Sequence, residues 1–139
     1  MVDRPHIVRS PATGRWVCWL KIMHEDGTQT ATVLTATDLL GPYEIVRTGL
    51  RPLGMSAGDF DLVVDRATGR TYYFFERVHS ELICAELTPD CTDVSGVHTA
   101  HLHRGSPPYV REAPAHFRRG DTHYLLTSGA DATSEGFGW

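Results

Sequence analysis

The fold is decided by residues 59–75, DFDLVVDRATGRTYYFF. Two short runs rich in β-branched and aromatic residues, 59–64 and 72–75, flank a polar segment that contains Thr68-Gly69. Apolar runs of this length, separated by a few residues that include glycine, are typical of two antiparallel strands joined by a turn. We therefore predict a β-hairpin here.

The hairpin pattern occurs three times along the chain. Its three copies cover residues 3–20, 59–75 and 112–126. Their turn glycines are Gly14, Gly69 and Gly120, which lie 55 (69 − 14) and 51 (120 − 69) residues apart. A period of this length fits four short strands with their turns, and such a unit is a blade of a β-propeller.

Two further strands are expected after each of the first two hairpins, at residues 30–36, 43–47, 81–87 and 97–103. The sequence thus predicts an all-β fold, an incomplete β-propeller of about two and a half four-stranded antiparallel blades. The blades are expected at about 3–54 and 55–108, with an inner hairpin at 109–129 and a poorly ordered tail at 130–139. Because a propeller closes with about four to eight blades, the chain should expose a blade edge through which it could self-associate.

Composition and charge exclude several classes of function. The chain of 139 residues has a net charge of −4 and no Lys/Arg run longer than Arg118-Arg119, which argues against a nucleic-acid partner. No apolar stretch approaches the roughly 18 residues of a membrane-spanning helix, so no membrane association is expected. The first residues show no apolar run behind a basic segment, so no secretory signal is expected from them, and the sequence leaves the localisation open.

The cysteines and most aromatic residues are expected to serve the core. Three cysteines without a C-x-x-C pair suit neither a disulfide framework nor a zinc site. Cys18 and Cys84 lie inside apolar runs, and we interpret them as buried thiols. Aromatic residues on the second strands should pack between blades; they are Trp16, Trp19, Tyr72, Tyr73, Phe74 and Phe75.

An acidic residue begins the first strand of each repeat, namely Asp3, Asp59 and Glu112. Since the first strands of propeller blades line the central channel, we expect the three carboxylates to converge on one axial pocket. Mutual repulsion and partial burial can there raise the pKa of one carboxylate above that of another. Glycosidic hydrolysis requires such a separation of a proton donor from an ionised partner. The alternative is that acids at strand starts are ordinary turn residues.

Histidines and one tyrosine are further candidates. His6 and His116 lie a few residues past an acid on first strands, where they could line the channel or pack in the core. His101 and His103 share one face of a predicted strand without a third ligand, so solvated histidines are favoured over a metal site. Tyr109 is the candidate for a ring that stacks on a sugar, because loops between blades rim the pocket. No metal or cofactor is expected.

Several segments, in their order along the chain, resemble glycoside hydrolase family 43. They are DRPHI at 3–7, LGPY at 40–43, GDFDL at 58–62 and REAPA at 111–115. The likeness runs from about residue 3 to residue 129 and is greatest to the exo-β-1,3-galactanase and β-xylosidase-like branch. It implies a five-bladed propeller, of which this chain would be a part, and hydrolysis with inversion at the anomeric carbon.

The resemblance also implies roles for the acids. Glu112 would be the general acid, and Asp59 would be the carboxylate that tunes its pKa and orients it. Asp3 stands where the galactanase-like branch usually has a glutamate that contacts substrate. Tyr109, His6 and His116 complete the predicted substrate-binding set. The catalytic base of the family has no assigned counterpart here, so we expect the isolated chain to lack turnover.

The activity that the resemblance implies is exo-acting hydrolysis of O-glycosyl bonds in galactan or in xylan- or arabinan-type side chains. The partner would be an oligo- or polysaccharide, and members of the family are often secreted. A fructosidase relationship is disfavoured, because the Arg-Asp-Pro and Glu-Cys pairs expected there are replaced by Gly58-Asp59-Phe60 and Glu112-Ala113. The remaining alternative is a non-catalytic carbohydrate-binding propeller fragment, which would have no need of Glu112.

Overall fold

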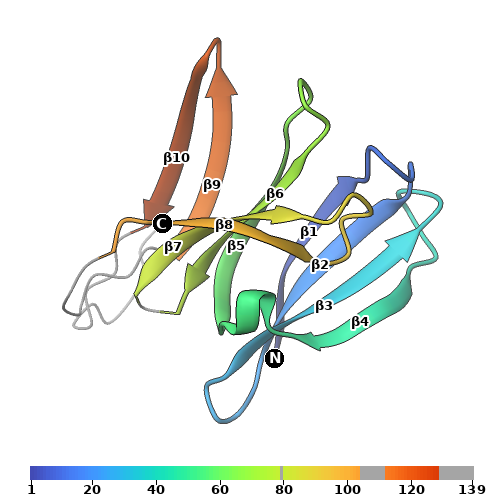
Figure 1. Cartoon of the computed structure of the whole chain (residues 1–139). Helices are drawn as coiled ribbons and strands as arrows, with labels where there is room; N and C mark the ends of the chain where they lie inside the picture. The colour runs from blue at the N-terminus through green and yellow to red at the C-terminus, as the bar shows by residue number, and fades with distance from the viewer. Residues whose placement is uncertain (79, 104–111, 129–139) are drawn as a thin grey trace.

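The computed structural model describes residues 1–78, 80–103 and 112–128, which form three antiparallel β-sheets in order along the chain (Figure 1). The first sheet contains β1 (Val2–Arg9), β2 (Trp16–Met23), β3 (Gln29–Ala36) and β4 (Glu44–Leu50). The second contains β5 (Ala57–Val64), β6 (Thr71–Arg77), β7 (Glu81–Leu87) and β8 (Val94–His101). The third is a hairpin of β9 (Glu112–Arg119) and β10 (Thr122–Ser128), and the short 3-10 helix η1 (Pro52–Gly54) links the first two sheets. The predicted all-β fold with four-stranded antiparallel blades is confirmed.

The predicted Thr-Gly turns close the inner hairpins of the first two sheets. In each turn the glycine is left-handed, with φ of 70° at Gly14 and 71° at Gly69, a conformation that glycine adopts without steric cost. Asp65 completes the second turn, since its carboxylate accepts the Ala67 N–H at 2.9 Å and the Thr68 hydroxyl at 2.7 Å. These local hydrogen bonds fix where β5 ends and β6 begins.

The core lies between the first and second sheets. Side chains alternate along β2 and β6, so Trp19 and Tyr73 point into this layer and pack with their ring centroids 4.8 Å apart. The Trp19 indole N–H donates to the Cys91 carbonyl at 2.8 Å, which satisfies its buried polar atom. The predicted packing of second-strand aromatics between blades is confirmed for Trp19, Tyr73 and Phe75, whereas Trp16, Tyr72 and Phe74 are half-buried.

The first strands of the three sheets are neighbours. β5 contacts both β1 and β9, so the inner strands follow one another across the molecule (Figure 1). β9 shares no backbone ladder with β5, because the two strands belong to different sheets. This arrangement brings together the three segments on which the sequence places the candidate acids.

Strand ends differ from the prediction where strands are exposed. β4 covers 44–50 rather than 43–47, β8 covers 94–101 rather than 97–103, and η1 has no counterpart in the sequence prediction. β4 and β8 are outer strands with almost no buried side chains, so no apolar alternation marks their ends. Tyr109 and the tail predicted at 130–139 lie outside the described residues. The described part of the chain contains no helix with the length and apolar character that a membrane crossing requires.

Candidate active site

The backbone bends sharply where β1 and β9 begin. Arg4 and Ala113, which follow Asp3 and Glu112, both have φ of 49°, a left-handed conformation that is strained for residues other than glycine. A proline follows each of them, and the strand pairing is irregular at both places. Irregularities of this kind bend a strand and re-aim its side chains. The two acids therefore lie at matching places in the first and third sheets.

Asp59 does not occupy the matching place in the second sheet. The last paired residue before the hairpin turn is Arg9 in β1 and Val64 in β5. Asp3 lies six residues before Arg9, whereas Asp59 lies five residues before Val64. The register therefore matches Asp59 with Arg4, while Gly58 matches Asp3. The expectation that Asp3 and Asp59 occupy one equivalent position is thus corrected, because Asp59 lies one residue further along its strand than Asp3.

Lys21, on β2, joins Asp3 and Asp59 in spite of this offset. Its ammonium lies 2.7 Å from Asp59 Oδ1 and 3.4 Å from Asp3 Oδ2, and its side chain is only 8% exposed. The Arg4 guanidinium reaches Asp59 Oδ2 at 2.9 Å. The partly buried Asp59 carboxylate, which is 14% exposed, therefore has a cationic partner on each of its oxygens.

Asp59 also reaches the third sheet. Its Oδ2 accepts the backbone N–H of Ala113 at 3.1 Å, and Ala113 directly follows Glu112 in the chain. Three strands thus contribute contacts to Asp59: Arg4 from β1, Lys21 from β2 and Ala113 from β9. Lys21 and Asp59 together connect the segments that carry the three predicted acids.

Asp3 is more open to solvent than Asp59, with 46% of its side chain exposed. The backbone N–H of Arg4 donates to Asp3 Oδ1 at 2.7 Å. This hydrogen bond, helped by the charges of Lys21 and Arg4, holds the pKa of Asp3 below its ordinary value, although partial desolvation acts in the opposite direction. Asp3 is therefore an ionised carboxylate at neutral pH that a ligand can reach.

One family model covers most of the chain. The model described as "Glycosyl hydrolases family 43" matches residues 7–137. The chain belongs to glycoside hydrolase family 43. The resemblance seen in the sequence is confirmed at the level of the family. No curated protein matches the chain at a significant level.

Solved family 43 structures share the fold of this chain. A family 43 β-1,3-galactosidase is 26% identical with a TM-score of 0.79, and the match covers 95% of this chain and 27% of that one. An exo-β-1,3-galactanase from Phanerochaete chrysosporium, solved with β-1,3-galactotriose, is 17% identical with a TM-score of 0.83 over 95% of this chain and 30% of that one. An endo-arabinase from Bacteroides thetaiotaomicron is 18% identical with a TM-score of 0.72 over 93% and 51%. The chain spans between about a quarter and a half of these structures, as part of a family 43 propeller.

Two buried charged residues of this family 43 chain, Lys21 and Glu76, are absent from the sequence prediction. Lys21 lies five residues after Trp16, the first paired residue of β2, and Glu76 lies five residues after Thr71, the first paired residue of β6. The two residues therefore occupy matching positions in their strands. Glu76 is 3% exposed, and its Oε2 lies 2.5 Å from the place that a Cβ on Gly58 would occupy. The Glu76 carboxylate therefore fills the room left by the missing side chain at the position that matches Asp3. A charged residue that follows the apolar run of a second strand is the signal that could have revealed both.

The two first-strand histidines are placed differently from each other. His6 Nδ1 lies 3.2 Å from Asp61 Oδ1, so its ring is held beside β5. The His116 backbone N–H donates to Asp61 Oδ2 at 2.6 Å, but the His116 ring stacks on Phe74 with centroids 5.4 Å apart. The structure therefore keeps His6 close to the acid-bearing strands and turns the His116 side chain into the space between the second sheet and the hairpin.

The other predicted histidines, His101 and His103, do not share a strand, because β8 ends at His101. His101 Nε2 lies 2.8 Å from the Thr99 hydroxyl, and His103 Nδ1 lies 3.7 Å from Glu81 Oε2. Both histidines are exposed. Across residues 1–78, 80–103 and 112–128, no group of three or more His, Cys, Asp or Glu side chains could hold a metal ion.

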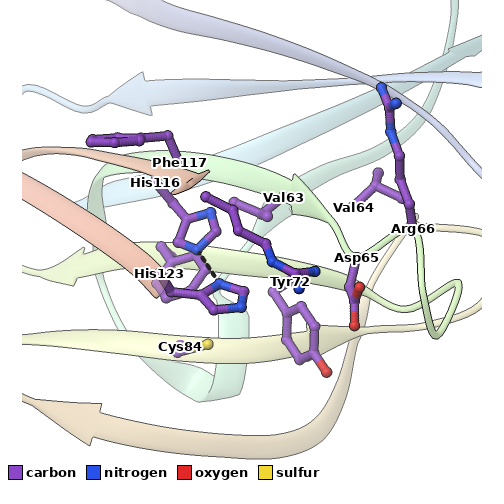
Figure 2. A pocket seen from close by; sticks show the side chains of 11 residues that line it. Val63, Val64, Asp65, Arg66, Tyr72, Cys84, His116, Phe117 and His123 are labelled. Atoms are coloured by element: carbon purple, nitrogen blue, oxygen red, sulfur yellow. Dashed lines mark hydrogen bonds between the residues drawn. The ribbon is translucent and has the colours of Figure 1, made fainter. Parts of the chain in front are cut away.

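A pocket of about 670 Å³ lies between the second sheet and the hairpin (Figure 2). His116 and His123 join there through a hydrogen bond of 2.9 Å. Cys84 also lines the pocket; it is half-buried rather than buried, and desolvation raises the pKa of its thiol to about 11. None of the three acids is among the lining residues, so this pocket is separate from the acid cluster.

Proposed function

We propose that this chain carries the proton-donating side of a glycosidase active site that removes terminal sugars from a β-1,3-linked galactan. Membership of family 43 supports hydrolysis of O-glycosyl bonds. Similarity to a β-1,3-galactosidase and an exo-β-1,3-galactanase favours galactan over arabinan or xylan side chains. The observation that carries the proposal is the pair of contacts at Asp59, which connects Lys21 and Asp3 on one side to Ala113, beside Glu112, on the other.

In this proposal Glu112 is the general acid. It gives its proton to the glycosidic oxygen as the bond from that oxygen to the anomeric carbon breaks, while a water molecule attacks the carbon from the opposite face and inverts it. Such a water needs a base about 6.5–9.5 Å from the acid. We assign no residue of this chain to the base, and we therefore expect the purified chain to bind sugar without turnover.

The other two acids, Asp59 and Asp3, differ in exposure, and we assign them different roles. Asp59, paired with Lys21 and Arg4, holds Ala113 and so orients Glu112. Asp3 is ionised and open, so it can accept hydrogen bonds from sugar hydroxyls. His6 and Tyr109 stay predicted substrate contacts, whereas the side chain of His116 faces the separate pocket.

Isothermal titration calorimetry with β-1,3-galactotriose tests this proposal. We expect the wild-type chain to bind, and Asp3→Ala and Glu112→Ala each to weaken binding about tenfold or more, because hydrogen bonds to charged groups are lost. Glu86→Ala is the matched control, since Glu86 is a carboxylate on β7 that pairs with Arg70. Xylo- and arabino-oligosaccharides should bind more weakly than the galactotriose.

Two results would overturn parts of the proposal. Binding that is equally strong in wild type, Asp3→Ala and Glu112→Ala would favour a non-catalytic carbohydrate-binding fragment instead. Hydrolysis of an aryl β-galactoside by the purified chain, abolished by Glu112→Gln, would show that the chain does contain a base.

A further inference from the structure

A second carboxylate of β5 bonds to the strand that carries Glu112. Asp61 Oδ2 accepts the backbone N–H of His116 at 2.6 Å. Its other oxygen, Oδ1, lies 3.2 Å from His6 Nδ1. Asp61 therefore connects β1, β5 and β9, as Asp59 does two residues earlier on the same strand.

The two carboxylates hold β9 at two points. Asp59 binds the N–H of Ala113, and Asp61 binds the N–H of His116, three residues further along β9. Because β5 and β9 share no backbone ladder, these side-chain contacts take the place of strand pairing between them. A single hydrogen bond would let the strand pivot, whereas two separated bonds fix both its position and its direction.

The environment of Asp61 keeps its carboxylate in the form that accepts hydrogen bonds. The side chain is 13% exposed, and this burial raises its pKa. The hydrogen bonds from His6 and from the His116 N–H outweigh the burial, so the pKa of Asp61 lies below its ordinary value. An ionised acceptor forms shorter and stronger hydrogen bonds than a neutral one.

We propose that Asp61, supported by His6, is a positioning residue that sets the place of Glu112 by fixing β9. The inference rests on the proposed role of Glu112 and adds a residue to which the sequence patterns give no role. Ala113 adjoins Glu112, so a shift of β9 moves the acid. A displacement of about 1 Å in a catalytic group can reduce a rate about a hundredfold.

Amide hydrogen exchange, followed by NMR on the full chain, tests the inference. Asp61→Ala should speed exchange at His116 and Ala113 by about tenfold or more, because a charge-assisted hydrogen bond to β9 is lost. Asp61→Asn should restore most of the protection, since its amide oxygen can still accept the His116 N–H. The affinity for β-1,3-galactotriose should follow the same order, falling in Asp61→Ala and recovering in Asp61→Asn.

The controls separate local positioning from loss of the fold. Exchange of the core amides of β2 and β6 should be unchanged in both Asp61 variants, and Glu86→Ala should leave Ala113 as protected as in wild type. If Asp61→Ala does not fold, His6→Ala is the substitute, because it removes the support of Asp61 without touching β9. Equal exchange at Ala113 in wild type and in the folded variants would overturn the inference. Fast exchange at Ala113 in the variants, in a chain that binds no galactotriose, would support the hold on β9 and refute the proposed function.

Discussion

Lys21 places an ammonium group between Asp3 and Asp59, with almost all of its side chain out of water. A buried charge is costly unless it is paired and hydrogen-bonded. Lys21 and Arg4 balance Asp3 and Asp59 in number, and Asp59 contacts both cations. At the scale of single residues, the site is therefore a balanced cluster in which the loss of one member leaves another charge uncompensated.

Lys21→Met should lower the free energy of unfolding by about 2–3 kcal/mol, because the partly buried Asp59 loses its shortest cationic contact and keeps only Arg4. Urea unfolding followed by tryptophan fluorescence measures the change. Arg70→Met is the matched control: its pair with Glu86, at 3.4 Å, is exposed and should contribute less than about 1 kcal/mol. Equal losses in the two variants would contradict the cluster as described.

The acids also predict how stability depends on pH. The pKa values of Asp3 and Asp61 are lower in the folded chain than their ordinary values, near 3.8. Their contribution to stability is therefore fully present above about pH 4–5 and is lost as the pH falls through the folded-state pKa values. Urea unfolding at pH 7, 5 and 3 should show a drop below about pH 4, and Asp61→Asn should show a smaller drop. A free energy of unfolding that is the same at pH 5 and pH 3 would refute this.

At the scale of elements, the beginning of β5 depends on the absence of a side chain at Gly58. A Cβ there would lie 2.5 Å from Glu76 Oε2 and 3.2 Å from Glu76 Cδ, so the buried carboxylate would have to move. Gly58→Ala should therefore cost about 1–3 kcal/mol in chemical unfolding, as overpacking of a buried site does. The control is a double-mutant cycle, in which the cost of Gly58→Ala should shrink in a Glu76→Ala background. A cost that is identical in both backgrounds would show that the clash with Glu76 is not the cause.

The inner strands could be predicted from the sequence because the signals that specify them lie within each hairpin. Period-2 apolar runs and left-handed turn glycines, Gly14 and Gly69, mark the hairpins without reference to the rest of the fold. Outer strands such as β8 have no buried face, so the sequence pattern predicted their ends wrongly. The one-residue offset of Asp59 from Asp3 is also local, since Asp3 lies 11 residues before Gly14 and Asp59 lies 10 residues before Gly69.

The site could be predicted only in part, for a related reason. The repeat pointed to Asp3, Asp59 and Glu112 as candidate acids at the strand starts, and the family resemblance implied their roles. The groups that connect them, Lys21 and the Ala113 N–H, depend on contacts between residues 38 and 54 positions apart in the chain. No local pattern reports which buried charge meets which carboxylate across two sheets, so such partners become visible only in the structure.

At the scale of the whole molecule, the two four-stranded sheets pack against each other, whereas one face of the β9–β10 hairpin is exposed to solvent. Phe117, Tyr124 and Leu126 of β9 and β10 are exposed. The rings of Phe117 and Tyr124 stack across the hairpin with centroids 4.8 Å apart, and Leu126, which pairs with Ala115, lies on the same face. Exposed apolar patches of this kind favour association.

We expect the purified chain to self-associate through this hairpin face and through the edge of β10, which pairs with no described strand other than β9. Sedimentation velocity should show a concentration-dependent increase in the mean sedimentation coefficient, because burial of the apolar side chains favours the associated form. Tyr124→Glu with Leu126→Glu should return the chain to monomer, while Val97→Glu on the exposed strand β8 is the matched control. A wild-type chain that stays monomeric at every concentration would contradict this expectation.

The central claim, that strands of three successive sheets supply one sugar-binding site, is tested most directly by NMR of the side-chain carboxyl carbons during titration with β-1,3-galactotriose. We predict that the ¹³C signals of Asp3, Asp59 and Glu112 move together and fit a single Kd, while the signal of Glu86 on β7 stays in place. If only one of the three signals responds, or if the sugar shifts other carboxyl signals and leaves these three unmoved, the three acids do not form one site.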